Sequence, residues 1–137
     1  MNRTGYQWDM IPNEYPPKST VYGYFQQWTE EGILEEISTD LRQNVRIAAD
    51  RNAKPSAAII DSQTQKTALH SESVGYDGGK NIKGRKRHTA VDVLGLIIVV
   101  IVHSAGIQER DGAKLVFTQM AKDFTIQRVW ALSLIHI

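Results

Sequence analysis

The sequence predicts an α/β fold in which a small helical domain precedes a sheet-forming domain. Apolar residues recur at helical spacing between residues 19 and 45, and short apolar runs of strand length follow from residue 57. The last elements have the order strand, helix, strand, a crossover that normally brings the two strands parallel in one sheet. With 137 residues, the chain has room for one modest domain, or for a small domain and part of another.

Two helices are expected in the N-terminal domain, residues 1–53. Ser19 or Thr20 can cap the first helix, and Gly32 is suited to end it. The second helix has one apolar face, made by Ile33, Leu34, Ile37, Leu41 and Val45. Such a helical hairpin is either a packing module or a helix-turn-helix that contacts DNA. An acidic cluster argues against contact with phosphate; it consists of Glu30, Glu31, Glu35 and Glu36.

The second domain, residues 54–131, begins in the polar segment Asp50–Ser56. The sequence then predicts a buried strand, a long loop at residues 66–84, a hairpin of two strands, an amphipathic helix capped by Asp111, and a fourth strand. The four expected strands are Ala57–Thr64, Arg87–Val93, Leu96–His103 and the segment from Gln127 to Ala131.

The composition excludes several classes of protein. There is no cysteine, so disulfides, cysteine-ligated zinc and thiol nucleophiles are ruled out. The most apolar run, Leu96 to Val102, has seven residues, whereas a membrane-spanning helix needs about 20. The first twenty residues contain prolines and charges and no apolar core, so we expect no signal peptide. These features predict a cytoplasmic protein that has no membrane partner.

Asp61 is the candidate catalytic carboxylate. It follows the apolar pair Ile59-Ile60, which places it at the carboxyl end of a predicted central strand. Ligands of open α/β sheets bind outside the carboxyl ends of the strands. A buried Asp at such a position is costly unless it is paired or holds a metal. The alternative is an Asp that caps the following turn.

A basic stretch runs from Lys80 to His88. Five of its nine residues are Lys or Arg, although the net charge of the whole chain is only +1. Dense positive charge on a glycine-rich, flexible backbone suits phosphate, so the stretch predicts nucleic-acid binding; the alternative is a solvated loop. The candidate DNA-binding residues are Lys80, Lys83, Arg85, Lys86, Arg87 and His88.

Other polar and aromatic residues are expected to be structural. His103, at the end of an apolar strand, is predicted to be a hydrogen-bonded residue of the fold, and Asp92 a turn residue. Asp77-Gly78-Gly79 is predicted to form a turn, because the later carboxylates of an EF-hand are missing. The tryptophans are expected to anchor the core; they are Trp8, Trp28 and Trp130.

Several segments carry one family pattern, in register over nearly all of residues 3–131. They are Arg3 to Trp8, Pro55 to Gln63, Gly75 to Lys80, Ile82 to His88, Val102 to Ala105 and Gln108 to Ala113. Together they resemble the bacterial insertion-sequence transposases of the DDE superfamily. The resemblance implies a ribonuclease H-like catalytic fold, of which this chain would contain the first part, β-β-β-α-β, after a helical N-terminal domain.

In this family an Asp, Asp, Glu triad holds two divalent metal ions. The resemblance therefore implies Mg²⁺ as cofactor and Asp61 as a catalytic residue and metal ligand. The second Asp of the family follows a Trp-Ala pair, but Leu132 follows Trp130-Ala131 here, and the Glu lies further downstream than this sequence reaches. The implied partner is double-stranded DNA, as transposon ends and as target, and the resemblance is compatible with a homo-oligomer.

Residues 132–137 do not continue the family pattern. They correspond to a translation of the transposon-end adapter that is used in sequencing libraries. We therefore expect a non-native tail on a truncated fragment, which with one carboxylate of three would neither cleave nor transfer DNA. The alternatives are a non-catalytic DNA-binding fragment that interferes with full-length transposase, and a decayed gene product without a role.

Overall fold

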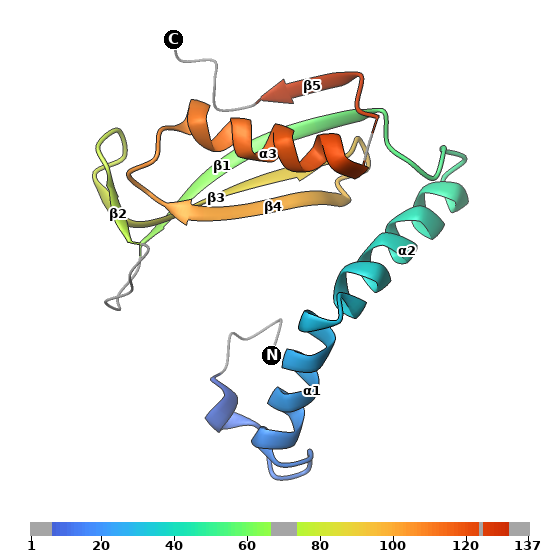
Figure 1. Cartoon of the computed structure of the whole chain (residues 1–137), viewed down its shortest axis with the longest axis vertical. Coiled ribbons are helices and arrows are strands. Elements are labelled where there is room, and N and C mark those ends of the chain that lie inside the picture. The colour runs from blue at the N-terminus through green and yellow to red at the C-terminus, as the bar shows by residue number, and fades with distance from the viewer. Residues whose placement is uncertain (1–6, 67–73, 124, 132–137) are drawn as a thin grey trace. The chain divides into compact units, whose positions relative to one another are not determined.

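The computed structural model describes residues 7–66, 74–123 and 125–131, and the chain divides into two compact units, Met1–Asn44 and Val45–Ile137 (Figure 1). The division falls within helix α2 (Ile33–Ala48), earlier than the segment Asp50–Ser56 that the sequence suggests as the boundary. Arg46 explains the difference, because its buried guanidinium in the last turn of α2 pairs with Asp92. That last turn is therefore part of the second unit.

The first unit contains the short 3-10 helix η1 (Trp8–Met10), helix α1 (Lys18–Glu30) and most of α2. α1 begins directly after Pro17, with no side-chain cap, so the prediction that Ser19 or Thr20 caps it is wrong. The fixed φ of proline suits the start of a helix, and Pro17 takes that position instead. Gly32 lies between the two helices with φ +74°, a left-handed conformation that favours glycine and ends α1 as predicted.

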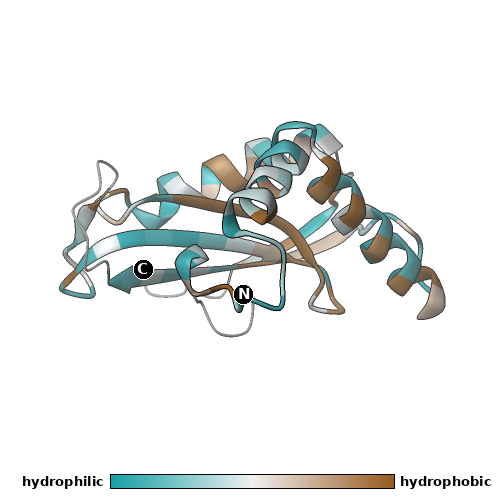
Figure 2. Cartoon of the chain, turned by 90° about the horizontal axis from the view of Figure 1, so that it is seen from below, coloured by the Kyte–Doolittle hydropathy of each residue, from teal (hydrophilic) through white to brown (hydrophobic). Residues whose placement is uncertain are grey.

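Aromatic side chains pack η1 onto α1. The Trp8 ring centroid lies 5.2 Å from that of Tyr22 and 5.5 Å from that of Phe25. No residue of α1 is buried, and Trp28 is 43% exposed, so its predicted role as a core anchor is wrong. Two helices without a second layer cannot enclose an indole ring. Hydrophobic and hydrophilic residues alternate along α2, as its amphipathic sequence predicts (Figure 2).

The second unit is a five-stranded sheet with one helix on it (Figure 1). β1 is central, antiparallel to β3 and parallel to β5, while β2 and β4 both pair with β3. Helix α3 (Glu109–Asp123) connects β4 to β5, so the predicted order strand, strand, strand, helix, strand is present, with β2 as an additional strand that the sequence analysis does not predict. The strands are β1 (Ala57–Lys66), β2 (Gly75–Asp77), β3 (Ile82–Val91), β4 (Ile97–Ser104) and β5 (Arg128–Ala131).

The starts of β3 and α3 differ from the sequence prediction. β3 begins at Ile82, five residues before the predicted strand, and pairs there with β2 inside the segment that was expected to be a loop. α3 begins at Glu109, two residues before its predicted cap Asp111, because the Gln108 carbonyl accepts the first helical amides. Asp111 instead lies in the first turn, where its negative charge interacts favourably with the positive end of the helix dipole.

The core lies between α3 and one face of the sheet, which we call the covered face. Its buried apolar side chains come from four elements, and they are Ala58, Ile60, Ala90, Ile98, Val99, Val116 and Met120. The apolar run of β4 is visible as a brown strand in Figure 2. Trp130 lies outside this core and is 49% exposed, so it is not the anchor that the sequence predicts. None of the described helices is long and apolar enough to span a bilayer.

Asp92 organises the turn between β3 and β4. One of its carboxylate oxygens accepts hydrogen bonds from the Leu94 and Leu96 amides, both at 2.9 Å, and the other pairs with Arg46. Gly95 supplies the left-handed residue of this turn, with φ +79°. The predicted turn residue is thus also the anion of a buried ion pair.

Candidate functional site

Asp61 lies on the face of the sheet opposite α3, which we call the open face. Successive side chains of a strand point to opposite faces, and the neighbours of Asp61 on both sides, Ile60 and Ser62, are buried on the covered face. Asp61 itself is half-buried. It is in the middle of β1, which continues to Lys66, so the prediction that it lies at the carboxyl end of the strand is wrong. Among the described residues, its carboxylate has no hydrogen bond or ion pair. An unpaired, partly buried carboxylate is an oxygen donor that a cation can use.

Positive side chains share the open face with Asp61. Residues directly opposite each other in paired strands lie on the same face, and Asp61 is opposite Thr89 while Gln63 is opposite Arg87. The Arg87 guanidinium donates a 2.7 Å hydrogen bond to the Gln63 side chain. By the same alternation along β3, Arg85 and the exposed Lys83 lie on this face too. The structure therefore brings three of the predicted DNA-binding residues to the face that carries Asp61.

The carboxyl end of β5 meets β1 beside Asp61. The two strands are parallel, with Ile59 opposite Trp130 and Ile60 opposite Ala131, the last described residue of β5. The chain therefore leaves β5 at the level at which β1 reaches Asp61. The next residue in the sequence, Leu132, lies outside the described residues.

Lys86 and His88 lie on the covered face, away from Asp61. Their exposed fractions are 3% and 1%, so neither side chain is available to a ligand in solvent. The Lys86 ammonium lies 3.2 Å from an Asp77 carboxylate oxygen and donates a hydrogen bond of the same length to the Ile107 carbonyl. The His88 ring stacks on that of His103, with centroids 5.0 Å apart. The alternation of β3 thus divides the basic stretch into an exposed and a buried set.

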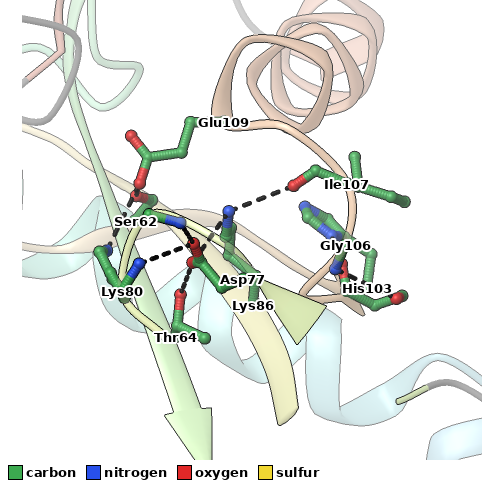
Figure 3. A network of polar contacts seen from close by, with 11 residues as sticks. Ser62, Thr64, Asp77, Lys80, Lys86, His103, Gly106, Ile107 and Glu109 are labelled. Carbon is green, nitrogen blue, oxygen red and sulfur yellow. Dashed lines mark hydrogen bonds and ion pairs between the residues drawn. The ribbon is translucent and has the colours of Figure 1, made fainter. Parts of the chain in front are cut away.

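Lys80 lies in the turn between β2 and β3 and joins a polar network on the covered face (Figure 3). Its ammonium is 3.4 Å from the Glu109 carboxylate, which also accepts a 2.9 Å hydrogen bond from the Ser62 hydroxyl. Burial by itself raises the pKa of Glu109, but the hydrogen bonds from Ser62 and Lys80 outweigh it, so that the pKa is lowered. Ser62 thereby ties the strand next to Asp61 to the start of α3.

Asp77 is the second carboxylate of this network. One oxygen accepts the Gly79 and Lys80 amides at 3.1 and 3.2 Å, as the predicted turn requires, and the other accepts the Thr64 hydroxyl at 2.7 Å. Burial raises the pKa of Asp77, but the Thr64 and Lys86 hydrogen bonds outweigh it and lower the pKa to about 2. Sequence reasoning found the turn and missed the ion pair. The alternation of Gly84, Lys86 and His88 is the signal that could have revealed a buried strand face.

The described residues hold no cluster of three or more His, Asp or Glu side chains that could bind a metal ion. A carboxylate without a hydrogen bond or ion pair suits a divalent cation that prefers oxygen ligands. Among the described residues of the open face, however, Asp61 is the one carboxylate at this site. The described part of the chain therefore supplies one ligand of a metal site and a basic surface beside it.

Comparison with known families gives two matches. A family model described as “Putative transposase of IS4/5 family” matches residues 1–38, and one described as “Transposase DDE domain” matches residues 52–131, or 80 of the 137 residues. Comparisons with curated proteins and with solved structures found no match.

Proposed function

The chain belongs to the transposase DDE domain family, and from this premise we propose that it is a fragment of an enzyme that binds the ends of an insertion sequence, cleaves them and joins them to target DNA. The family carries out DNA transposition, with double-stranded DNA as its partner. The observation that carries the proposal is the position of Asp61, whose carboxylate has no partner among the described residues, on the same face as Arg87 and next to the end of β5.

Asp61 would be the residue of this chain that holds the divalent metal. Two such ions, when bound by a complete triad, activate the attacking oxygen and stabilise the leaving oxygen of a phosphodiester. The basic residues of the open face would bind DNA. Arg87, oriented by Gln63, and the exposed Lys83 can hold the DNA backbone next to Asp61, since guanidinium and ammonium groups bind phosphate oxygens.

We further propose that the 137-residue chain does not itself cleave DNA. A two-metal site needs several carboxylates, and Leu132 stands where the family pattern has its second Asp. With a single carboxylate, most ligands of a bound Mg²⁺ ion would be water molecules, so the affinity of the chain for Mg²⁺ should be low.

Cleavage and metal binding test these proposals together. A duplex with labelled transposon ends should stay intact with the wild-type chain, and nicking that Asp61→Asn abolishes would refute the proposed inactivity. In the variant Leu132→Asp, a second carboxylate that directly follows β5 in the sequence should tighten Mn²⁺ binding, measured by paramagnetic relaxation. The same change in an Asp61→Asn background should give no gain. An equal gain in both backgrounds would refute the role of Asp61 as a metal ligand.

A non-catalytic DNA-binding fragment that interferes with full-length transposase is the second candidate. The combination of a basic open face with one lone carboxylate favours it, because phosphate contact does not need the metal. Salt-sensitive DNA binding without nicking, lost in a Lys83→Gln/Arg87→Gln variant, would support this function. Wild-type binding that does not weaken with salt would contradict it.

A further inference from the structure

Two histidines, the buried His88 and the half-buried His103, lie under the first turns of α3, outside the site proposed above. His88 extends from β3 and His103 from β4, and their rings stack at an interplanar angle of 30°. The Nε2 atoms of both rings are buried and have no hydrogen-bond partner among the described residues. Neither the metal-binding proposal nor the DNA-binding proposal uses these two rings.

The backbone of Gly112 in α3 packs directly against the Nε2 atoms of both rings. A Cβ atom at this position would lie 2.3 Å from the His88 Nε2 and 2.5 Å from the His103 Nε2, well inside van der Waals contact. The backbone of α3 can therefore approach the two rings only because residue 112 is glycine. Both nitrogens point at the helix backbone and reach no acceptor there.

The contacts of His103 indicate the protonation state that this arrangement requires. Its Nδ1 lies 2.8 Å from the Ser104 carbonyl oxygen, which can only accept, so Nδ1 carries the hydrogen. In the neutral ring, Nε2 is then an acceptor with a lone pair. Protonation would add an N–H there that has no acceptor, and a buried donor without an acceptor is unfavourable.

The charged groups around His88 also disfavour a second positive charge. Lys86 lies on the same face of the same strand, Lys80 lies in the turn between β2 and β3, and the N-terminal end of α3 carries the positive end of the helix dipole. The pKa of His88 is lowered from 6.5, mainly by burial and also by the charges of His103 and Lys86. The negative charge of Glu109 in α3 raises it, but by less. Asp77 of β2 is already paired with Lys86, and β1 presents the uncharged Ser62 opposite His88.

We propose that the His88–His103 pair is an acid-sensitive latch that holds the first turns of α3 on β3 and β4 while both rings are neutral, and releases them when a ring takes up a proton. The docked helix binds fewer protons than the released one, so acid favours release. Docking is complete above pH 6.5, the ordinary pKa of histidine, and weakens as the pH falls below it. Because Glu109 belongs to the same helix turn, release also separates it from Ser62 and Lys80.

Hydrogen exchange of the full chain tests the latch. Protection factors of the α3 amides, which are corrected for the intrinsic effect of pH, should fall about tenfold between pH 6.5 and pH 5, while the β1 amides serve as the internal reference. His103→Asn keeps a donor for the Ser104 carbonyl, and combined with His88→Gln it removes both titrating rings, so α3 protection in this double variant should become independent of pH. His70→Gln removes a histidine outside the pair and should leave the wild-type fall unchanged.

Three results would overturn the proposal. They are an equal fall at α3 and β1, a fall that persists in His103→Asn combined with His88→Gln, and a fall that disappears in His70→Gln. If the histidine variants do not fold, the ¹⁵N chemical shifts of the wild-type imidazoles decide. The latch requires His88 to titrate below pH 6.5 and the hydrogen of neutral His103 to lie on Nδ1, and titration of His88 at or above 6.5 refutes it.

Discussion

The buried pair between Arg46 and Asp92 allows a sharp test of the fold. The Asp92 side chain is fully buried and that of Arg46 is 6% exposed, so removing the anion leaves a guanidinium away from water. Breaking a buried pair by removing one partner costs about 3–5 kcal/mol, a large share of the roughly 5–15 kcal/mol that stabilises a domain. Asp92→Asn is the right change, because an amide oxygen can still accept the Leu94 and Leu96 amides.

Urea unfolding at pH 7, followed by far-UV circular dichroism, measures this loss. Asp111→Asn is the matched control, since Asp111 pairs with Lys114 on the exposed surface of α3, and its loss should lower the unfolding free energy far less than the loss of Asp92. The double variant Asp92→Asn/Arg46→Met should be less destabilised than the sum of its single changes, because no charge remains buried. A loss for Asp92→Asn of less than about 1 kcal/mol, as for a surface pair, would refute the buried ion pair.

Three further predictions concern the sheet. Gly112→Ala places a Cβ 2.3 Å from the His88 Nε2, so it should lower the unfolding free energy by about 1–3 kcal/mol, and an unchanged urea midpoint would contradict that contact. Because the pKa of Asp77 is lowered from 3.8 to about 2, its stabilising effect should be complete above pH 3.8 and disappear as the pH falls through 2. Acid titration of the wild type against Asp77→Asn measures this effect, and two parallel curves would exclude it. Arg87→Gln should weaken DNA binding and reduce the slope of log K against log salt by about 0.9, whereas Lys86→Met should leave that slope unchanged; equal slopes in a binding titration would disprove the division of β3.

The sequence predicts those strands and helices whose pattern of apolar residues matches their burial in the fold. The run Ala57–Ile60 is apolar because β1 is central, and Asp61 follows it on the open face, although β1 continues beyond it to Lys66. The run of β-branched residues in β4 and the helix-strand crossover after it are equally direct. These signals are local, so a single sequence reveals them.

The basic stretch shows where local signals fail. Lys86 looks like a surface residue, yet it is buried because Asp77, nine positions earlier, meets it across the β2–β3 hairpin. Glu109 is one of several charged residues at the start of a predicted helix, yet its carboxylate binds both Ser62 and Lys80. Burial of charge depends on strand register, and register follows from pairing between distant segments, which no window of sequence contains.

The two-sided character of β3 has a practical consequence for mutational scanning. Along Lys83–His88, every second substitution should alter ligand affinity while leaving the melting temperature almost constant, and those in between should do the reverse. Neighbouring codons would then carry unrelated phenotypes. A library averaged over this segment would hide both effects, whereas separate scores for odd and even positions would distinguish variants that fold but no longer bind from variants that no longer fold.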